Sequence, residues 1–258
     1  MDLLEGALIL LAGAAAGTIN AAVGSGSLIT FPTLLAFGIP PVTANISNNI
    51  GLVPGGLASV WGYRRELADQ RRRLLVLGSM SVLGGVIGAV LLLAAPASAF
   101  RAVVPVLIGI AIVLVAAQPF IQRALTRRRE RRGRATGPDA RPATMLATAL
   151  TGIYGGYFGG AQGILLVGAL GVLMSESLQR LNALKNALTT AVNTVAAVTF
   201  LVIAASQVDW RVVGLIAVGS TAGGLLGARI GRKLPQPVLR GVIVVVGLVA
   251  IVNLLRPA

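Results

Sequence analysis

The 258-residue sequence contains no cysteine and no histidine, and only 12% of its residues are charged. Without cysteine and histidine, the chain cannot form disulfides and lacks the usual ligands of zinc and haem. A soluble domain carries about twice this share of charged residues. Because hydrophobic residues make up 55% of the chain, we expect an integral membrane protein, with no cofactor and no bound metal.

The charges that are present are strongly biased toward one sign. Lys and Arg number 22 against 8 Asp and Glu, which gives a formal net charge of +14. On a soluble surface such an excess would suggest nucleic-acid binding. Here the basic residues cluster in short segments between apolar runs, as in the cytoplasmic loops of membrane proteins. We therefore expect contacts with membrane lipid and none with nucleic acid.

Eight apolar segments follow one another along the chain. They lie at about 6–37, 43–62, 74–95, 102–122, 143–174, 183–205, 210–228 and 238–255. About 20 helical residues cross the hydrocarbon core, so six of these segments fit one crossing each. The first and fifth segments are too long for a single crossing, and each contains a glycine-rich motif. We expect each to be a broken or re-entrant helical hairpin.

The two glycine motifs align with each other. The first reads GTINAAVGSGS from Gly17, and the second reads GIYGGYFGGAQG from Gly152, so that Gly24 aligns with Gly159. Interrupted apolar segments at corresponding places in two halves of a membrane protein are typical of transporters, in which a broken helix exposes backbone groups to the solute. The sequence predicts an all-α integral membrane protein with two homologous halves of about four hydrophobic segments each.

The basic stretch 123–142 separates the two halves. We expect an N-terminal transmembrane repeat at 1–122, a basic cytoplasmic linker at 123–142 and a C-terminal transmembrane repeat at 143–258. If both long segments enter and leave the membrane on one side, most basic loops face the cytoplasm, as the positive-inside rule requires. The halves are then inverted repeats with both termini outside. Trp61 and Tyr63 are expected in the aromatic belt at the inner interface.

Neutral donors near the two breaks favour an anionic solute. Glycine allows the backbone to approach a ligand closely, and a half-helix that begins after a break directs its free N–H groups and positive dipole end toward it. Ser25, Ser27 and Gln162 add side-chain donors. The candidate substrate-binding residues are Asn20, Gly24, Ser25, Gly26, Ser27, Asn45, Asn48, Asn49, Gly159, Gly160, Ala161, Gln162, Gly163, Asn182, Lys185 and Asn186.

Several of these residues have an alternative structural role. The glycines of both motifs could serve close helix packing, and this role is expected for Gly84, Gly85, Gly88, Gly223, Gly224 and Gly227. The asparagines, and Asn193 with them, either face a cavity or join helices through hydrogen bonds. Lys185 either snorkels to the inner interface or faces the cavity as the counter-charge of an anion. Small-residue faces would also permit a homodimer.

The repeated motifs resemble the TauE/SafE family of sulfite and organosulfonate exporters, whose members have two similar halves that each open with a glycine-rich motif. The resemblance covers nearly the whole chain. It implies a multi-pass protein of the bacterial inner membrane that is not an enzyme and that exports a small sulfur-containing anion, such as sulfite or sulfoacetate, by alternating access. Ser25, Ser27 and Gln162 depart from the glycine-rich pattern and leave the anion open. The alternatives are a transporter of carboxylates or amino acids, and a membrane assembly subunit that transports nothing.

Overall fold

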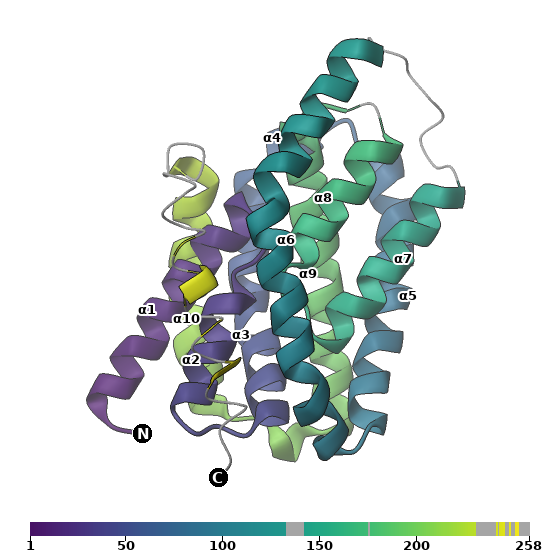
Figure 1. Ribbon diagram of the computed structural model, residues 1–258. Coiled ribbons are helices and arrows are strands. Elements are labelled where there is room, and N and C mark those ends of the chain that lie inside the picture. Colours follow the sequence, from purple (N-terminus) through teal and green to yellow (C-terminus); the bar gives the residue numbers. More distant parts are fainter. Residues whose placement is uncertain are drawn as a thin grey trace.

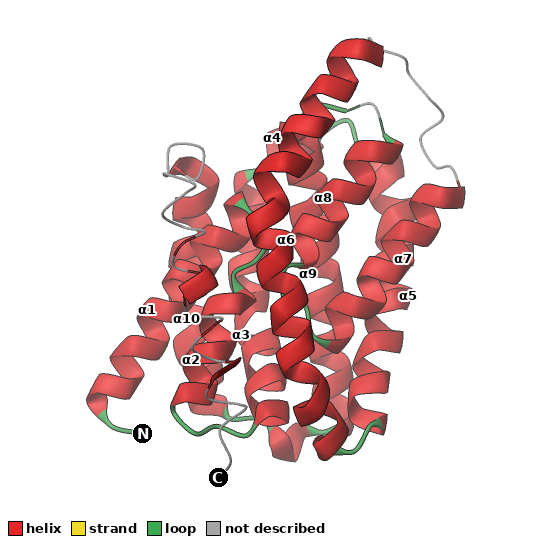
Figure 2. Ribbon diagram, in the orientation of Figure 1, coloured by secondary structure: helices red, strands yellow, loops and turns green. Residues whose placement is uncertain are grey.

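The computed structural model describes residues 1–132, 142–174 and 176–230, together with 241, 243–245, 248, 251 and 252. The described part of the chain is a bundle of helices (Figure 1) and contains no strand (Figure 2). The first half contains α1 (Leu3–Ala22), α2 (Ser27–Ala36), α3 (Pro41–Gly62), α4 (Arg64–Leu67), α5 (Arg71–Ala94) and α6 (Ala97–Arg132). The second half contains α7 (Pro142–Tyr157), α8 (Gln162–Leu173), α9 (Leu178–Ile203), the 3-10 helix η1 (Ala205–Gln207) and α10 (Trp210–Ile230). The all-helical class is confirmed.

Five of the described helices are long and apolar enough to cross a membrane: Leu3–Ala22, Arg71–Ala94, Ala97–Arg127, Leu178–Ile203 and Trp210–Arg229. Large apolar side chains such as Val113 and Val202 stay exposed on their outer faces. Such faces are unfavourable in water and favourable against lipid tails. The protein is therefore a multi-pass membrane protein.

Local sequence explains where several helices begin and end. Asp2 caps α1 and forms a capping box with Glu5, and Pro41 starts α3, where its missing N–H costs nothing. Helix α6 continues to Arg132, so the first ten residues of the predicted linker 123–142 are helical. Residues 133–141 and most of the predicted last segment 238–255 lie outside the described residues.

Both long segments are interrupted at their glycine motifs. The chain leaves helix between α1 and α2, and again between α7 and α8. Gly24 and Gly159 have φ angles of 92° and 78°, in the left-handed region that favours glycine. Helix α1 starts at the lower end of the bundle and α7 starts at the upper end, and α2 and α8 each lead back toward the end from which their hairpin started (Figure 1).

The two halves pack through matched glycines. Helix α1 lies against α10, and α7 lies against α5. A methyl group added to any of four glycines would collide with a backbone oxygen of the facing helix: Gly84 with Ala149 (2.3 Å), Gly88 with Ile153 (2.1 Å), Gly223 with Ala14 (2.0 Å) and Gly227 with Thr18 (2.5 Å). The packing role predicted for these glycines is confirmed. The alignment that pairs Gly24 with Gly159 also pairs Ala14 with Ala149 and Thr18 with Ile153. Residues at corresponding positions in the two halves therefore make corresponding contacts.

Candidate functional site

The two broken segments touch each other in the core of the bundle. The N–H of Gly163 donates to the backbone oxygen of Gly24 at 3.1 Å. A methyl group added to Gly24 would lie 2.6 Å from the Cα of Gly163, and one added to Gly163 would lie 2.6 Å from the Cα of Gly24. Only glycine at both positions permits this approach. The breaks of the two halves, predicted separately from the sequence, therefore form one site.

A small cavity lies beside this contact. Seven of the candidate residues line it: Asn20, Gly24, Ser27, Gly159, Gln162, Gly163 and Asn186. Thr189, Thr190 and Asn193 of α9 also line it. Asn193 was expected either to face a cavity or to join helices, and the two threonines were not predicted, although their polar side chains stand in an apolar segment. The cavity has a volume of about 30 Å³, which is room for one or two water molecules. In this conformation it is polar, central and too small for a larger solute.

The amide groups that follow each break bond within the chain. The N–H of Gly26 donates to Oδ1 of Asn20 at 2.7 Å, and the N–H of Gln162 donates to the backbone oxygen of Gly159 at 3.3 Å. The expectation that these half-helix ends present free N–H groups is therefore wrong for Gly26, Gln162 and Gly163 in this conformation. A ligand could use them only by replacing these bonds.

Lys185 of α9 is fully buried beside the two breaks. Its Nζ donates to the backbone oxygens of Asn20 at 2.8 Å and Ala21 at 3.4 Å, and its Cδ would lie within about 3.1 Å of a methyl group on either Gly24 or Gly163. Because the side chain has no exposed surface, the alternative that it snorkels to the interface is wrong. The last carbonyls of α1 carry the negative end of the helix dipole and stabilise the cation.

No acidic side chain forms an ion pair with Lys185 among the residues described. A buried charge is costly unless it is paired. The two carbonyl oxygens satisfy part of its bonding capacity, since an ammonium group has three donors. The site therefore holds a buried lysine without an acidic partner among the described residues.

Asparagines from one half cap the broken helix of the other half. Nδ2 of both Asn182 and Asn186 lies 3.2 Å from the backbone oxygen of Ala21, near the end of α1. In the same manner, Nδ2 of Asn45 donates at 3.1 Å to the backbone oxygen of Tyr157, the last residue of α7. These asparagines join helices, and they also donate hydrogen bonds to carbonyl groups that the breaks would otherwise leave without a partner.

The other nine candidate residues do not line the central cavity: Ser25, Gly26, Asn45, Asn48, Asn49, Gly160, Ala161, Asn182 and Lys185. Asn48 accepts a hydrogen bond from the hydroxyl of Thr30. Ser25 is buried, and its hydroxyl has no hydrogen-bond partner within the described structure. Its hydrogen-bonding capacity is therefore unused in this conformation.

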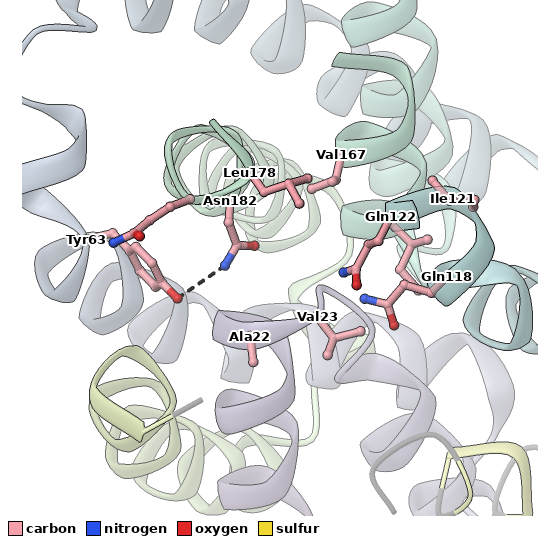
Figure 3. A pocket seen from close by; sticks show the side chains of 11 residues that line it. Ala22, Val23, Tyr63, Gln118, Ile121, Gln122, Val167, Leu178 and Asn182 are labelled. Carbon is pink, nitrogen blue, oxygen red and sulfur yellow. Dashed lines mark hydrogen bonds between the residues drawn. The ribbon is translucent and has the colours of Figure 1, made fainter. Parts of the chain in front are cut away.

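Asn182 lies instead in a second and larger cavity of about 200 Å³ (Figure 3). Tyr63 also lines it, with only 2% of its surface exposed, and its hydroxyl accepts a hydrogen bond from Asn182 at 3.2 Å. The expectation that Tyr63 belongs to the aromatic belt is therefore wrong. Trp61 is 54% exposed with the guanidinium of Arg64 over its ring, as suits an interfacial tryptophan. Gln118 and Gln122 of α6 were missed, although two carboxamides one turn apart mark one helix face.

The described site joins a buried lysine, neutral donors and two backbone breaks, which suits binding and passage of a polar solute. Comparison with known proteins agrees. Residues 9–254 match the family described as sulfite exporter TauE/SafE. No solved structure matches the chain.

Two curated relatives are membrane proteins of similar length. The "Probable membrane transporter protein YfcA" of Escherichia coli K12 is 28% identical over 98% of this chain and 90% of its own. A "Probable membrane transporter protein" of Haemophilus influenzae is 26% identical over 95% of this chain and 91% of its own. Since the family match spans nearly all of the sequence, the chain belongs to the TauE/SafE family and is a membrane transporter, not an enzyme.

Proposed function

We propose that this transporter is a secondary exporter of small sulfur-containing anions, such as sulfite or an organosulfonate like sulfoacetate. The buried cation of Lys185 carries the proposal, because no described carboxylate neutralises it. An anion that enters the central cavity comes near this charge, which lies behind Gly24 and Gly163, and meets neutral donors such as Gln162 and Ser27. Hydrogen bonds to a charged group are worth about 1.5–3 kcal/mol each.

Transport follows from alternating access between two inverted repeats, with α1–α2 and α7–α8 as re-entrant hairpins. The matched contacts of α1 with α10 and of α7 with α5 support this arrangement, as does the start of the two hairpins from opposite ends of the bundle (Figure 1). A central cavity of about 30 Å³ must widen before an organic anion can enter. Rocking of one repeat against the other would separate the glycine contact and open it to one side at a time.

The membrane potential favours the outward direction. An inside-negative potential stabilises outward movement of an anion by about 2.3 kcal/mol per charge per 100 mV, so export needs no coupling ion. We place the protein in the bacterial inner membrane, with the arginine-rich end of the bundle in the cytoplasm. The described basic residues of this end include Arg64, Arg71 and Arg180, whereas Asp209 and Trp210 lie at the opposite end.

A binding experiment followed by a flux experiment tests the proposal. The purified protein is heated in detergent with sulfite, thiosulfate, sulfoacetate, taurine, sulfate, acetate or a neutral amino acid. We expect a sulfur-containing anion to raise the melting temperature selectively, and the same anion to leave proteoliposomes faster under an inside-negative potential than without one. Stabilisation by an amino acid alone would overturn the substrate class, and binding without flux would overturn transport of that anion.

A further inference from the structure

The larger cavity, which we call the vestibule, is separate from the central cavity. Residues of α1, α6, α8 and α9 line it, together with Val23 and Tyr63. Its lining includes Gln179, an exposed residue at the start of α9, so the vestibule reaches the surface there. This position belongs to the arginine-rich end of the bundle, near Arg180, whose positive potential attracts anions.

Polar groups stand at two sides of the vestibule. Figure 3 shows the carboxamides of Gln118 and Gln122 on one side and Tyr63 with Asn182 on the other. Apolar side chains, such as Val167 of α8, lie between them. On the scale by which the central cavity of about 30 Å³ has room for one or two water molecules, the volume of about 200 Å³ holds a solute of several non-hydrogen atoms. This lining fits a small organic molecule with a polar group at each end.

The end of α1 divides the vestibule from the central cavity. Ala22 and Val23 line the vestibule, while Gly24 lines the central cavity. The backbone oxygen of Ala21 accepts one hydrogen bond from Asn182, which lines the vestibule, and another from Asn186, which lines the central cavity. A solute that passes from one cavity to the other must displace this end of the helix. The hydrogen bond between Asn182 and Ala21 lies on the path of the solute.

We infer that the vestibule is a second solute site, in series with the central cavity, and that the bond between Asn182 and Ala21 closes the passage between them. The site takes a small organic anion with a second polar group, and Gln122 lies at its edge. The inference rests on the proposed function, since it assumes that the solute passes through the central cavity.

Cysteine protection tests the vestibule, because the natural chain has no cysteine to give a background signal. Gln122→Cys is compared with Thr126→Cys, an exposed position one turn further along α6. The purified variants react with a methanethiosulfonate reagent with or without sulfoacetate, which carries an anionic group at each end. At ten times its dissociation constant, sulfoacetate should slow modification of Gln122→Cys about ten-fold by occupancy, and that of Thr126→Cys less than two-fold.

A second pair of variants tests whether the solute passes through the vestibule, by filling the cavity with a large side chain. Val167→Trp fills the vestibule, whereas Val172→Trp places the same side chain on the exposed face of the same helix. We expect sulfoacetate flux through proteoliposomes to fall at least ten-fold in the first variant and less than two-fold in the second. Equal flux in both variants would overturn the passage through the vestibule.

The outcomes separate the two proposals. If sulfoacetate raises the melting temperature of the unmodified protein but leaves Gln122→Cys unprotected, the vestibule is not a binding site and the transport proposal stands. If Gln122→Cys is protected and Val167→Trp blocks flux, both are supported. If neither sulfoacetate nor sulfite binds the unmodified protein, both proposals fail.

Discussion

The N–H of Gly163 donates a hydrogen bond to the backbone oxygen of Gly24, so that one residue from each half closes the contact between the two breaks. Lys185 lies alongside this contact, with its charge on the last carbonyls of α1. The three residues make the centre of the protein sensitive to both helix position and charge. A movement of one half against the other would change the contact between Gly24 and Gly163, and an anion bound near Lys185 would affect the same contact.

Gly24→Ala should destabilise the protein strongly. Alanine disfavours the positive φ at this position by about 1–2 kcal/mol, and its methyl group would meet the backbone of Gly163, which adds about 1–3 kcal/mol of overpacking. The apparent melting temperature in detergent measures the effect. Gly78→Ala on α5 is the control: no atom lies within 4 Å of its added methyl group, so it should be neutral or slightly stabilising. Equal melting temperatures for the two variants would contradict the contact.

Lys185→Met should abolish anion binding without unfolding the protein. Methionine retains most of the apolar volume and removes a buried charge that lacks an acidic partner, so the melting temperature without ligand should not fall. The anion loses a charged donor worth about 1.5–3 kcal/mol, or about ten- to a hundred-fold in affinity. Arg101→Met, at an exposed position, should leave affinity unchanged. Unaltered anion affinity in Lys185→Met would show that this lysine is only a cap for α1.

Gly223→Ala should separate α10 from α1. Its methyl group would lie 2.0 Å from the backbone oxygen of Ala14, and relief of this overlap costs about 1–3 kcal/mol. Gly214→Ala on the same helix meets no atom within 4 Å and should gain about 0.5–1 kcal/mol from helix propensity. Thermal unfolding of both variants in one detergent tests the difference. A Gly223→Ala protein as stable as the Gly214→Ala protein would mean that the two helices do not approach this closely.

The arginine-rich end should face the cytoplasm. Ala68→Cys, near α4, and Ser206→Cys, in η1, introduce single exposed cysteines toward opposite ends of the bundle. In intact bacterial cells a membrane-impermeant maleimide should label Ser206→Cys at once and Ala68→Cys only after permeabilisation, as the positive-inside rule requires. The reverse pattern would invert the topology and with it the side from which the vestibule opens.

Most of the helices could be predicted from the sequence. An apolar run of about 20 residues is long enough to cross the membrane, and in lipid it must form a helix, in which the backbone hydrogen bonds are made within the segment. The interruption of the first and fifth segments was equally readable, since clustered glycines break long apolar helices. The extension of α6 to Arg132 was not, because a basic, polar stretch has the same composition in a linker and in a solvated helix.

The candidate site was readable only in part. Gly24 and Gly163 were identified as candidates, but no sequence pattern states that they touch each other. Tyr63 was assigned to the interface because aromatic residues next to arginines commonly lie there, whereas the fold buries it against Asn182. The spacing of Gln122 from Gln118 places both on one helix face, but this signal is too weak to separate them from ordinary polar residues near a helix end.

The sequence by itself determined the class of molecule, since its apolar runs, its excess of arginine and its paired glycine motifs depend on local composition and spacing. The tertiary structure decided which polar groups meet. Whether Lys185 reaches the interface or the core depends on how α9 packs against the end of α1, and that packing is set by contacts between residues about 165 positions apart. Such contacts leave no periodic trace in either segment, so only the folded chain places the cation beside the two breaks.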